Sequence, residues 1–370
     1  MALDERAGYI ALALTPGIGA ARLDTLLQHF GSAHGALSAP FEFLGTVPGI
    51  SVAAATAIGE SHRHGADQVL REVERLGARC LLPTDPEFPG SCREIPDRPT
   101  LLFAMGDLSL LERPAVAIVG SRDHSDYGGT AGREMAHGAA ARGLVVVSGM
   151  ARGLDAIAHA AALDAGGATI GVLGNGLGVI YPAANRKLYQ RVAEQGLLIT
   201  EFPPGERPMI GSFPRRNRLI SALARVTVVI EAAIGSGAMI TVGTALAQGR
   251  DVMAVPGNID SPTSVGTNQL IRDGAEPLLV LNDLLAHYPE ANQVASPEGT
   301  PARANSASPM PAGLGPAETR IYRLLTAGPC GTDQLILSAE LPAHEALAAL
   351  SQLELRGIVS QERGVVRLAV

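Results

Sequence analysis

The sequence is poor in cysteine and in aromatic residues. Its 370 residues include three cysteines, no tryptophan and only 4% aromatic side chains. Cys80, Cys92 and Cys330 are odd in number and widely spaced, which argues against both a disulfide framework and a zinc site. The histidines form no metal-ligand pattern with cysteines or carboxylates. We therefore expect a protein of the reducing cytoplasm that holds no metal.

Long apolar runs are missing as well. No uninterrupted apolar stretch reaches about 18 residues, so the sequence predicts no membrane-spanning helix. Residues 1–14 contain a short apolar run without a basic leader or a stop-transfer pattern. With 46% hydrophobic and 18% charged residues, the composition is that of an ordinary soluble globular protein, and the length allows two or three domains.

The sequence also lacks an excess of positive charge. The formal net charge is −7, which is unfavourable for a protein that binds nucleic acid. Net charge is a statement about solubility, however, and a local basic cleft can coexist with an acidic body. Nucleic acid therefore stays among the possible partners, provided that the arginines gather in one place.

Glycine, in contrast, is abundant, with 43 residues. Between residues 115 and 257, short apolar runs repeatedly lead into a small-residue loop and then into a segment with helical spacing. This repetition predicts an α/β fold, an open Rossmann-like parallel sheet with helices on both faces, and a crevice lined by the loops at the carboxyl ends of the strands. The expected strands are Ala115–Val119, Leu144–Val147, Thr169–Leu173, Val226–Ile230 and Asp251–Val255, and the expected helices include Thr130–Arg142, Ala156–Ala165 and Met239–Gln248.

The segment 1–66 contains two similar pieces. Pro16-Gly17-Ile18-Gly19 and Pro48-Gly49-Ile50 each precede a helical pattern. A Pro-Gly turn between helices resembles the helix-hairpin-helix motif, whose turn can offer backbone amides to a phosphate. Arg22 is offset by Asp24, and the second copy has no basic residue near its turn. A packing or protein-contact role is therefore favoured over phosphate binding.

The expected sheet domain covers residues 67–290. A helix over 65–76 spans the start of this domain, and a proline-rich segment over 80–99, expected to be irregular, and a short strand over 101–104 follow it. Residues 291–316 are rich in alanine, serine, proline and glycine. Such a composition cannot bury enough apolar area to fold alone, so a flexible tether is expected there.

Residues 317–370 predict a small winged-helix domain. Three helical patterns are followed by two short strands that join at Arg363-Gly364. The third helix carries Glu345 and Glu354 against a lone Arg356, so it lacks the basic face that major-groove docking requires. A structural or protein-contact role is favoured over DNA binding.

Two arginines follow neighbouring strands of the expected sheet. Arg122 comes directly after the strand that ends at Val119, and Arg152 lies in the loop after the next strand. The nearest carboxylate to Arg122 is Asp123, which points the other way if the loop is extended. Two arginines above one crevice favour an anionic ligand over structural ion pairs.

A denser basic cluster lies in the segment Ser212–Ile220. If Pro214 opens the helix, Arg215, Arg216 and Arg218 all lie in its first turn. Cations are unfavourable at the positive end of a helix, unless an anion completes the site. A solvated basic face is the alternative.

Three further loops bear on chemistry. Gly235-Ser236-Gly237 precedes a helix and exposes amides and a hydroxyl, which suits a phosphate. The segment Gly174–Gly178 lacks the spacing of a dinucleotide fingerprint, so a tight turn is favoured and no cofactor is expected. His159 follows Asp155 by one helical turn, but no G-x-S-x-G elbow is present, so an anchoring histidine is favoured over a hydrolase.

Taken together, these motifs resemble the DNA-processing protein A (DprA/Smf) family over nearly the whole core. The resemblance implies an extended Rossmann-like domain that binds single-stranded DNA as a homodimer and is not an enzyme. It also implies two partners, the RecA recombinase, which the family loads onto DNA during natural transformation, and single-strand-binding protein. The matching segments are Val116–Arg122, Ser148–Asp155 with Ala158-His159, Tyr181-Pro182 with Asn185, Phe213–Ile220, Glu231-Ala232 with Ser236-Gly237 and Ile240-Thr241, Val255–Gly257, and Gly266–Asn268 through Gly274-Ala275.

The resemblance also implies which residues contact the strand. Arginines would hold phosphates, Phe213 would stack on a base, and the glycine-rich loops would offer amides. Many members have a lysine after Tyr181-Pro182, where this chain has Ala183-Ala184, so either Arg186 and Lys187 substitute or binding is weaker. The expected contact set is Gly120, Ser121, Arg122, Gly149, Arg152, Asn185, Arg186, Lys187, Phe213, Arg215, Arg216, Asn217, Arg218, Ser236, Gly237 and Thr241.

A competing hypothesis is an enzyme on the same fold. The core also resembles the nucleoside monophosphate phosphoribohydrolases, in which an arginine and a glutamate of this crevice cleave a nucleotide. Those enzymes carry a Pro-Gly-Gly-x-Gly-Thr loop followed by a pair of glutamates. This chain has Glu231–Gly237 instead, without that proline or the second carboxylate, so DNA binding is favoured.

Overall fold

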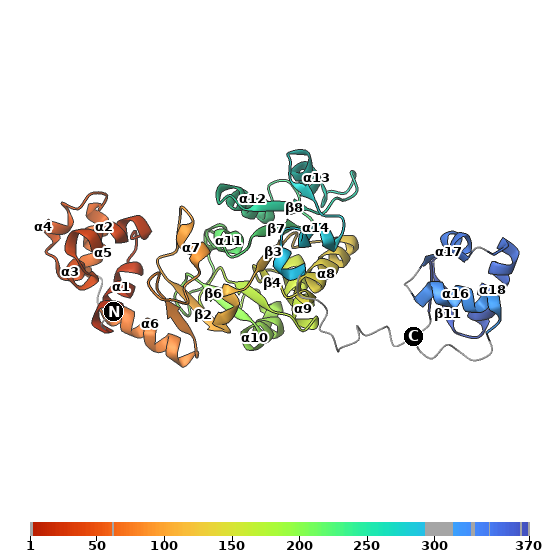
Figure 1. The fold of residues 1–370 in the computed structure, drawn as a ribbon. Helices are drawn as coiled ribbons and strands as arrows, with labels where there is room; N and C mark the ends of the chain where they lie inside the picture. Colours follow the sequence, from red (N-terminus) through yellow and green to blue (C-terminus); the bar gives the residue numbers. More distant parts are fainter. Residues whose placement is uncertain are drawn as a thin grey trace. The chain divides into compact units, whose positions relative to one another are not determined.

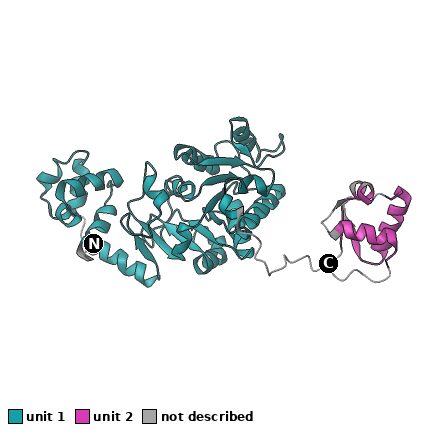
Figure 2. Ribbon diagram, in the orientation of Figure 1, with its two compact units in different colours: residues 1–294 teal, residues 295–370 magenta. Residues whose placement is uncertain are grey.

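The computed structural model describes residues 3–60, 63–292, 314–326, 330–339, 341–362 and 365–368. The chain divides into two compact units, residues 1–294 and 295–370 (Figure 2). The finer division into 1–66, 67–290, 291–316 and 317–370 stays a prediction. The expected tether lies largely outside the described residues. No helix among the described residues is long and apolar enough to cross a membrane.

The first unit is built on a nine-stranded sheet in the order β1-β2-β6-β5-β4-β3-β7-β8-β9 (Figure 1). The strands from β6 to β9 in this order pair in parallel, and β2 and β1 extend the β6 edge antiparallel. The predicted mostly parallel sheet is confirmed. The bounds are β1 Arg79–Leu81, β2 Leu102–Gly106, β3 Ala115–Val119, β4 Val145–Ser148, β5 Thr169–Val172, β6 Leu197–Thr200, β7 Val226–Val229, β8 Asp251–Ala254 and β9 Glu276–Pro277.

Both faces of the sheet are covered by helices. Alternate residues of β3 point to opposite faces: Val116 and Ile118 pack with α8 and α9, whereas Ala117 and Val119 pack with α11 and α12. This double burial explains why the strands are apolar at every position. The helices of this part are α8 Asp126–Ala141, α9 Leu154–Asp164, α10 Arg186–Gln195, α11 Ser212–Ala222, α12 Gly237–Ala247, α13 Val265–Arg272, α14 Leu281–Leu285 and α15 Pro289–Asn292.

The sheet changes its direction of growth at β3. From β3 the chain first adds β4, β5 and β6 on one side, and it then returns to add β7, β8 and β9 on the other. Such a switch point leaves a crevice outside the carboxyl ends of the two diverging strands. Here these ends carry the loops after Val119 and after Val229. The fold therefore places the Gly-Ser-Arg loop opposite the Gly-Ser-Gly loop.

Helices form the N-terminal part of the first unit. Both predicted Pro-Gly turns are present, and Gly17 and Gly49 have φ of 83° and 80°, a left-handed conformation that favours glycine. The apolar cluster of these helices, which includes Ile10 and Leu26, is continuous with Phe103 and Leu198 of the sheet. The bounds are α1 Leu3–Ala13, α2 Ala20–Phe30, α3 Ala33–Ser38, α4 Phe41–Leu44, α5 Val52–Glu60 and α6 Arg63–Arg75.

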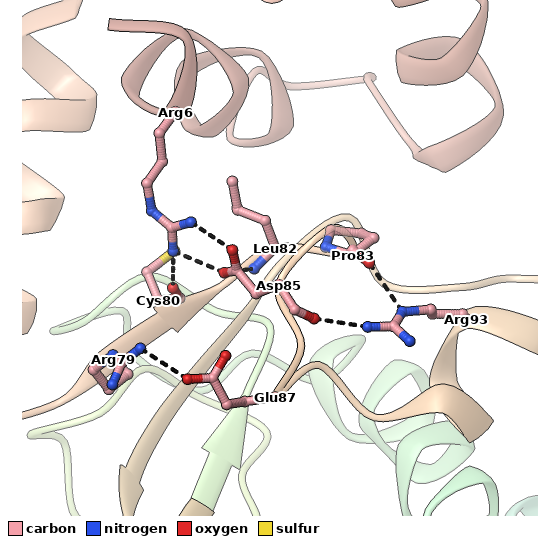
Figure 3. A network of polar contacts seen from close by, with 8 residues as sticks. All are labelled: Arg6, Arg79, Cys80, Leu82, Pro83, Asp85, Glu87 and Arg93. Atoms are coloured by element: carbon pink, nitrogen blue, oxygen red, sulfur yellow. Dashed lines mark hydrogen bonds and ion pairs between the residues drawn. The ribbon is translucent and has the colours of Figure 1, made fainter. Parts of the chain in front are cut away.

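A polar joint attaches these helices to the sheet (Figure 3). Arg6 of α1 donates to both carboxylate oxygens of Asp85, at 2.8 and 2.9 Å, and also to the carbonyl of Cys80. Asp85 accepts a further hydrogen bond from the amide of Leu82 at 2.8 Å. Nearby, Arg98 pairs with Asp24 of α2. The joint therefore fixes both the loop after β1 and the segment before β2.

The segment 80–99 is irregular over most of its length, as expected, but it also contains two short regular pieces that the sequence did not predict. Cys80 and Leu81 belong to β1 and pair with Phe103 and Leu102 of β2, and a short helix, α7 Gly90–Glu94, follows. Arg93 of this helix donates to the carbonyls of Pro83 and Asp85. The prolines restrict the loop between β1 and α7, while long-range pairing decides the strand, so local composition alone was misleading.

The second unit is a winged helix, as predicted. Its three helices surround an apolar cluster that includes Ile321, Leu335 and Leu353, and its sheet has the order β10-β12-β11. The predicted turn at Arg363-Gly364 lies outside the described residues. The bounds are α16 Pro316–Thr326, β10 Cys330–Gly331, α17 Thr332–Ala339, α18 Ala343–Leu355, β11 Val359–Glu362 and β12 Val365–Leu368.

Candidate anion-binding crevice

A pocket of about 440 Å³ lies at the switch point of the sheet. The loop after β3, the first turns of α11 and the N-terminus of α12 line it together. The structure thus brings together residues that are more than 100 positions apart in the sequence. The sequence-predicted residues that line this pocket are Gly120, Ser121, Arg122, Phe213, Arg216, Asn217, Ser236, Gly237 and Thr241.

A second, smaller pocket adjoins the first on the other side of Phe213. The ring of Tyr181 lies 5.7 Å from the ring of Phe213, measured between centroids, and the Arg122 guanidinium lies 5.7 Å from the Phe213 centroid. Gly174 after β5 makes room for this ring, because a Cβ there would lie 2.8 Å from it. Arg122, Tyr181 and Phe213 therefore form one partly exposed aromatic and cationic wall.

Arg122 is exposed, and it makes no ion pair with any described residue. Its positive charge also acts on the neighbouring Arg216, whose pKa burial lowers to about 10, against the opposing effect of Asp155 and with a further lowering from Arg122. Two guanidinium groups thus lie near each other above one carboxylate. An anion in the crevice would relieve this repulsion.

Arg216 is buried, and its hydrogen bonds are spent on the sheet. Its guanidinium donates to the carbonyls of Gly149 and Val172, at the ends of β4 and β5, and to the side chain of Asn217 at 3.1 Å. A Cβ at Gly149 would collide with this group at 2.8 Å. Arg216 lines both pockets, so it supplies positive potential to the crevice from a fixed position.

The sequence analysis placed Arg218 in the first turn of its helix, and this prediction is wrong. The helix α11 begins at Ser212, two residues before Pro214, so Arg218 falls in the second turn. Its guanidinium donates to both oxygens of the buried Glu201 at 2.6 Å and lies 3.2 Å from Asp97. This charge is neutralised inside the fold and the side chain lines neither pocket, so the structure does not bring Arg218 into the crevice, and its contact with DNA stays a prediction.

Arg215 lies on the outer side of the same helix. Its side chain is 55% exposed, stacks 5.4 Å above the centroid of Phe202 and lies 3.7 Å from Glu201. Glu201 is already held by Arg218, so Arg215 keeps part of its charge available to solvent. It lines neither pocket, which places it beside the crevice.

Arg152 has a partner that the sequence analysis discounted. Its guanidinium lies 3.0 Å from the carboxylate of Asp123, in an ion pair whose side chains are 61% and 80% exposed. Exposed pairs of this kind contribute only about 0–1 kcal/mol, so an incoming phosphate can compete for the arginine. The side chain also lines the smaller pocket.

The N-terminus of α12 faces the larger pocket. Ser236 occupies the N-cap position, and its buried hydroxyl finds no hydrogen-bond partner among the described residues. Gly237 is exposed, and its carbonyl accepts from Asn217 at 3.2 Å. Free amides, a positive helix end and an unsatisfied hydroxyl make this turn suited to an anion.

The remaining predicted residues line neither pocket. Asn185 donates to the carbonyls of Met150 and Ala151, at 2.9 and 3.1 Å, so it holds the loop after β4. Met150 has a φ of 55°, which is unusual for a residue other than glycine, and these bonds stabilise that conformation. Arg186 and Lys187 are exposed at the start of α10, where their predicted contact with DNA is not tested.

The buried histidine anchors a helix, as the sequence analysis favoured. Thr169 donates its hydroxyl proton to Val146, so it accepts from Nδ1 of His159 at 2.6 Å, and Nε2 faces the amide of Met150 at 3.4 Å. Burial, with a smaller effect of Arg216, lowers the pKa of His159 to about 3. The ring is therefore neutral and fixed, and it has no proton to exchange near neutral pH.

Glu231 has no catalytic freedom either. Its carboxylate accepts from the amide and hydroxyl of Ser125, at 2.9 and 2.5 Å, and from the hydroxyl of Thr263 at 3.0 Å. Asp155 likewise accepts from the amides of Gly149 and Ala151. Among the described residues, no group of three or more side chains is arranged to hold a metal ion. The carboxylates of the crevice therefore hold loops in place.

The lining residues that were absent from the predicted set include three large exposed ones. Tyr181 is 47% exposed beside Phe213, and Ile210 and Ile240 line the larger pocket with exposures of 92% and 43%. An aromatic residue in a loop beside a predicted crevice was an available signal for Tyr181. A single isoleucine in a loop or on a helix gives no such signal, because its exposure is a property of the folded chain.

The fold and the crevice together define a class: Rossmann-like α/β proteins with an anion-receptive crevice at the switch point of an extended sheet. Comparison with known sequences narrows this class, because the family of DNA recombination-mediator protein A matches residues 79–289 and the DprA winged helix domain matches residues 305–364. The chain belongs to the DprA/Smf family. This is a family of recombination mediators and not of enzymes, so the chain is not an enzyme, as predicted.

Individual relatives agree over most of the chain. It is 34% identical over 393 residues to Protein Smf of Synechocystis sp., with 99% of each chain covered. The structure of DNA processing protein A from Streptococcus pneumoniae is similar with a TM-score of 0.67 and 33% identity, over 75% of this chain and 97% of that one. A structure of DNA processing protein A from Helicobacter pylori, described in terms of its single-stranded DNA binding mode, has a TM-score of 0.53 and 31% identity over 58% and 96%.

Proposed function

We propose that this chain binds single-stranded DNA in the crevice, protects it, and loads the RecA recombinase onto it during natural transformation. The observation that carries the proposal is Arg122, an exposed arginine with no described ion-pair partner, beside Phe213. Family membership supports it, because relatives are recombination mediators and the Helicobacter pylori protein has a single-stranded DNA binding mode.

The polar groups of the crevice suit the phosphates of a strand. Arg122 supplies an exposed charge, Arg216 a buried one, and Ser236 an unsatisfied hydroxyl at a helix N-terminus. Guanidinium groups and free amides are the donors that proteins use for phosphate oxygens. The net charge of −7 is then no obstacle, because the arginines gather in one place while the acids lie elsewhere or are already paired.

The aromatic wall favours a single strand over a duplex. Tyr181 and Phe213 offer ring surface to a base, and base–aromatic stacking contributes about 1–3 kcal/mol per base. The bases of a duplex are already stacked and paired, so they cannot stack on these rings without unpairing. Duplex DNA is therefore expected to bind through phosphates only.

A homodimer and a recombinase partner belong to the same proposal. Leu279 and Val280, which follow the edge strand β9, are 66% and 54% exposed. An exposed edge with apolar neighbours is suited to pairing with a second copy. Light scattering tests this: Leu279→Asp is expected to lower the measured mass towards that of one chain. Single-strand-binding protein would be displaced as RecA is loaded, and both events place the protein in the cytoplasm.

The decisive experiment measures binding of a labelled oligo-dT by fluorescence anisotropy at several salt concentrations. Wild type is expected to bind with a steep salt dependence, and Arg122→Ala to lose at least tenfold in affinity and about 0.7 in the slope of log affinity against log salt. Arg142→Ala, at an exposed arginine on the far ends of the strands, is the matched control. Salt-insensitive or absent binding by wild type would contradict the proposal, and ribose release from nucleoside monophosphates would then be assayed.

A further inference from the structure

The larger pocket has an apolar rim as well as a polar floor. Ile210 precedes α11 and is 92% exposed, and Ile240 lies in the first turns of α12 and is 43% exposed. Both line the same pocket, one just before α11 and the other on α12, two helices that pack against each other, and Pro214 also lines it. The neighbouring Met209 adds another exposed apolar side chain, at 63%.

This arrangement is unfavourable for the isolated chain. Burial of an isoleucine stabilises a fold, and the 92% exposure of Ile210 forgoes nearly all of that contribution. Single exposed apolar residues are ordinary on protein surfaces. Two exposed isoleucines that line one pocket with groups suited to phosphate are better evidence for a binding site, because one ligand would contact both.

The chemistry of the rim identifies which part of a ligand lies against it. Phosphate oxygens gain nothing from isoleucine and lose hydration beside it, so they belong on the floor near Arg122 and Ser236. The charged acids of the same lining are already engaged, Asp123 with Arg152 and Asp155 with backbone amides. The part of a ligand that contacts the rim is therefore a flat apolar group attached to a phosphate chain.

We propose that Ile210 and Ile240 contact nucleobases of the strand whose phosphates lie on the crevice floor, and that they are specificity-determining residues for single-stranded over double-stranded DNA. The inference rests on the proposed function. An unpaired base presents an apolar face that is covered in a duplex, so contact with the rim adds affinity only for the single strand. Isoleucine reads no base edge, so this contribution is independent of sequence.

The test separates base contacts from phosphate contacts. Wild type, Ile210→Ser, Ile240→Ser and the double variant are titrated with oligo-dT, with an abasic oligonucleotide of equal length and with duplex. The exposed Leu246→Ser, on α12 but outside the pocket, is the matched control. Because both isoleucines are exposed, the variants are expected to fold, and thermal unfolding checks this.

Each single variant is expected to lose roughly threefold to tenfold in affinity for oligo-dT. The salt slope stays at the wild-type value, since no charge has changed. Affinity for the abasic strand and for duplex stays within about twofold of the wild-type value, so the ratio of the affinity for oligo-dT to either of these affinities falls. The control variant keeps the wild-type preference.

Three outcomes would overturn the inference while leaving the proposed function in place. The isoleucine variants could bind oligo-dT like wild type, or they could lose affinity for oligo-dT and the abasic strand equally. They could also keep all DNA affinity and lose binding of RecA, which would make the rim a protein contact. If wild type itself shows no salt-dependent binding of oligo-dT, the proposed function fails first.

Discussion

Two regions of the first unit hold arginines beside loops, and they treat the charge in opposite ways. In the joint below the N-terminal helices, Arg6 donates hydrogen bonds to Asp85, Arg79 to Glu87 and Arg93 to backbone carbonyls (Figure 3). In the crevice, the Arg122 guanidinium lies over the ring of Phe213 and forms no ion pair with a carboxylate among the described residues. The arginines of the joint already have partners within the protein, whereas Arg122 in the crevice is available to bind an anionic ligand.

The comparison also divides the basic cluster of α11. Arg218 lies between Glu201 and Asp97, so carboxylates neutralise its charge as Asp85 neutralises that of Arg6, whereas Arg216 donates to strand-end carbonyls and keeps its charge. Only Arg215, half-exposed, resembles Arg122. An arginine's role therefore follows from whether the fold already neutralises its charge, and adjacent arginines on one helix can have different roles.

The largest effect is expected for the clamp on Arg218. Glu201→Ala leaves a buried guanidinium with only the exposed Asp97, so the free energy of unfolding should fall by about 3–5 kcal/mol. Asp123→Ala, which removes the partner of an exposed arginine, should cost less than about 1 kcal/mol. Chemical denaturation of both variants measures the difference. Equal losses would break the distinction between neutralised and available arginines.

The buried histidine next to Arg216 gives a prediction about pH. Burial depresses the pKa of His159 to about 3 in the folded chain, while the unfolded chain has an ordinary value of about 6.5. Below pH 6.5 only the unfolded state takes up this proton, so stability falls by about 1.4 kcal/mol per pH unit until about pH 3.

The histidine prediction is checked by comparing two variants. Denaturation of His159→Gln at pH 6, 5 and 4 should show a shallower fall than wild type, by about that slope. His137→Gln, at an exposed position on α8, is the control and should follow wild type. Parallel curves for all three proteins would mean that His159 is not held neutral.

A smaller effect is expected at the joint. Burial alone would raise the pKa of Asp85, but hydrogen bonds from Arg6 and Leu82 outweigh it and lower the pKa below the ordinary value. The pair therefore stabilises the fold fully above the unfolded pKa of about 4, and its contribution is lost as the pH falls through the lower folded value. Arg6→Ala should cost about 2 kcal/mol at pH 7 and less at pH 3. A constant cost across this range would show that Arg6 acts by packing alone.

The smallest effect on stability is expected where the effect on binding is largest. Arg122→Ala removes no described ion pair, so its thermal unfolding should match wild type within about 0.5 kcal/mol. Calorimetry of the free protein checks this beside the oligo-dT titration. A marked loss of stability would mean that Arg122 belongs with the arginines of the joint.

The sequence was sufficient for the strands and loops of the core, because a parallel strand buried on both faces is apolar at each position and must end in a turn. It was insufficient for the partners of the arginines. Glu201 is 17 positions from Arg218 and Asp97 lies in a loop before β2, so no local pattern joins them. The strand β1 was missed for the same reason, since its pairing with β2 depends on residues more than 20 positions apart.

The close approach of Gly174 to Phe213 has a consequence for how the family can vary. Any side chain at position 174 would push the aromatic ring out of the crevice wall, because even a Cβ would lie 2.8 Å from it. The two positions are therefore constrained to change together: a relative that has gained a larger residue at the first is expected to carry a smaller one at the second. Covariation between them, in an alignment of relatives, would record the shape of the crevice wall without a structure.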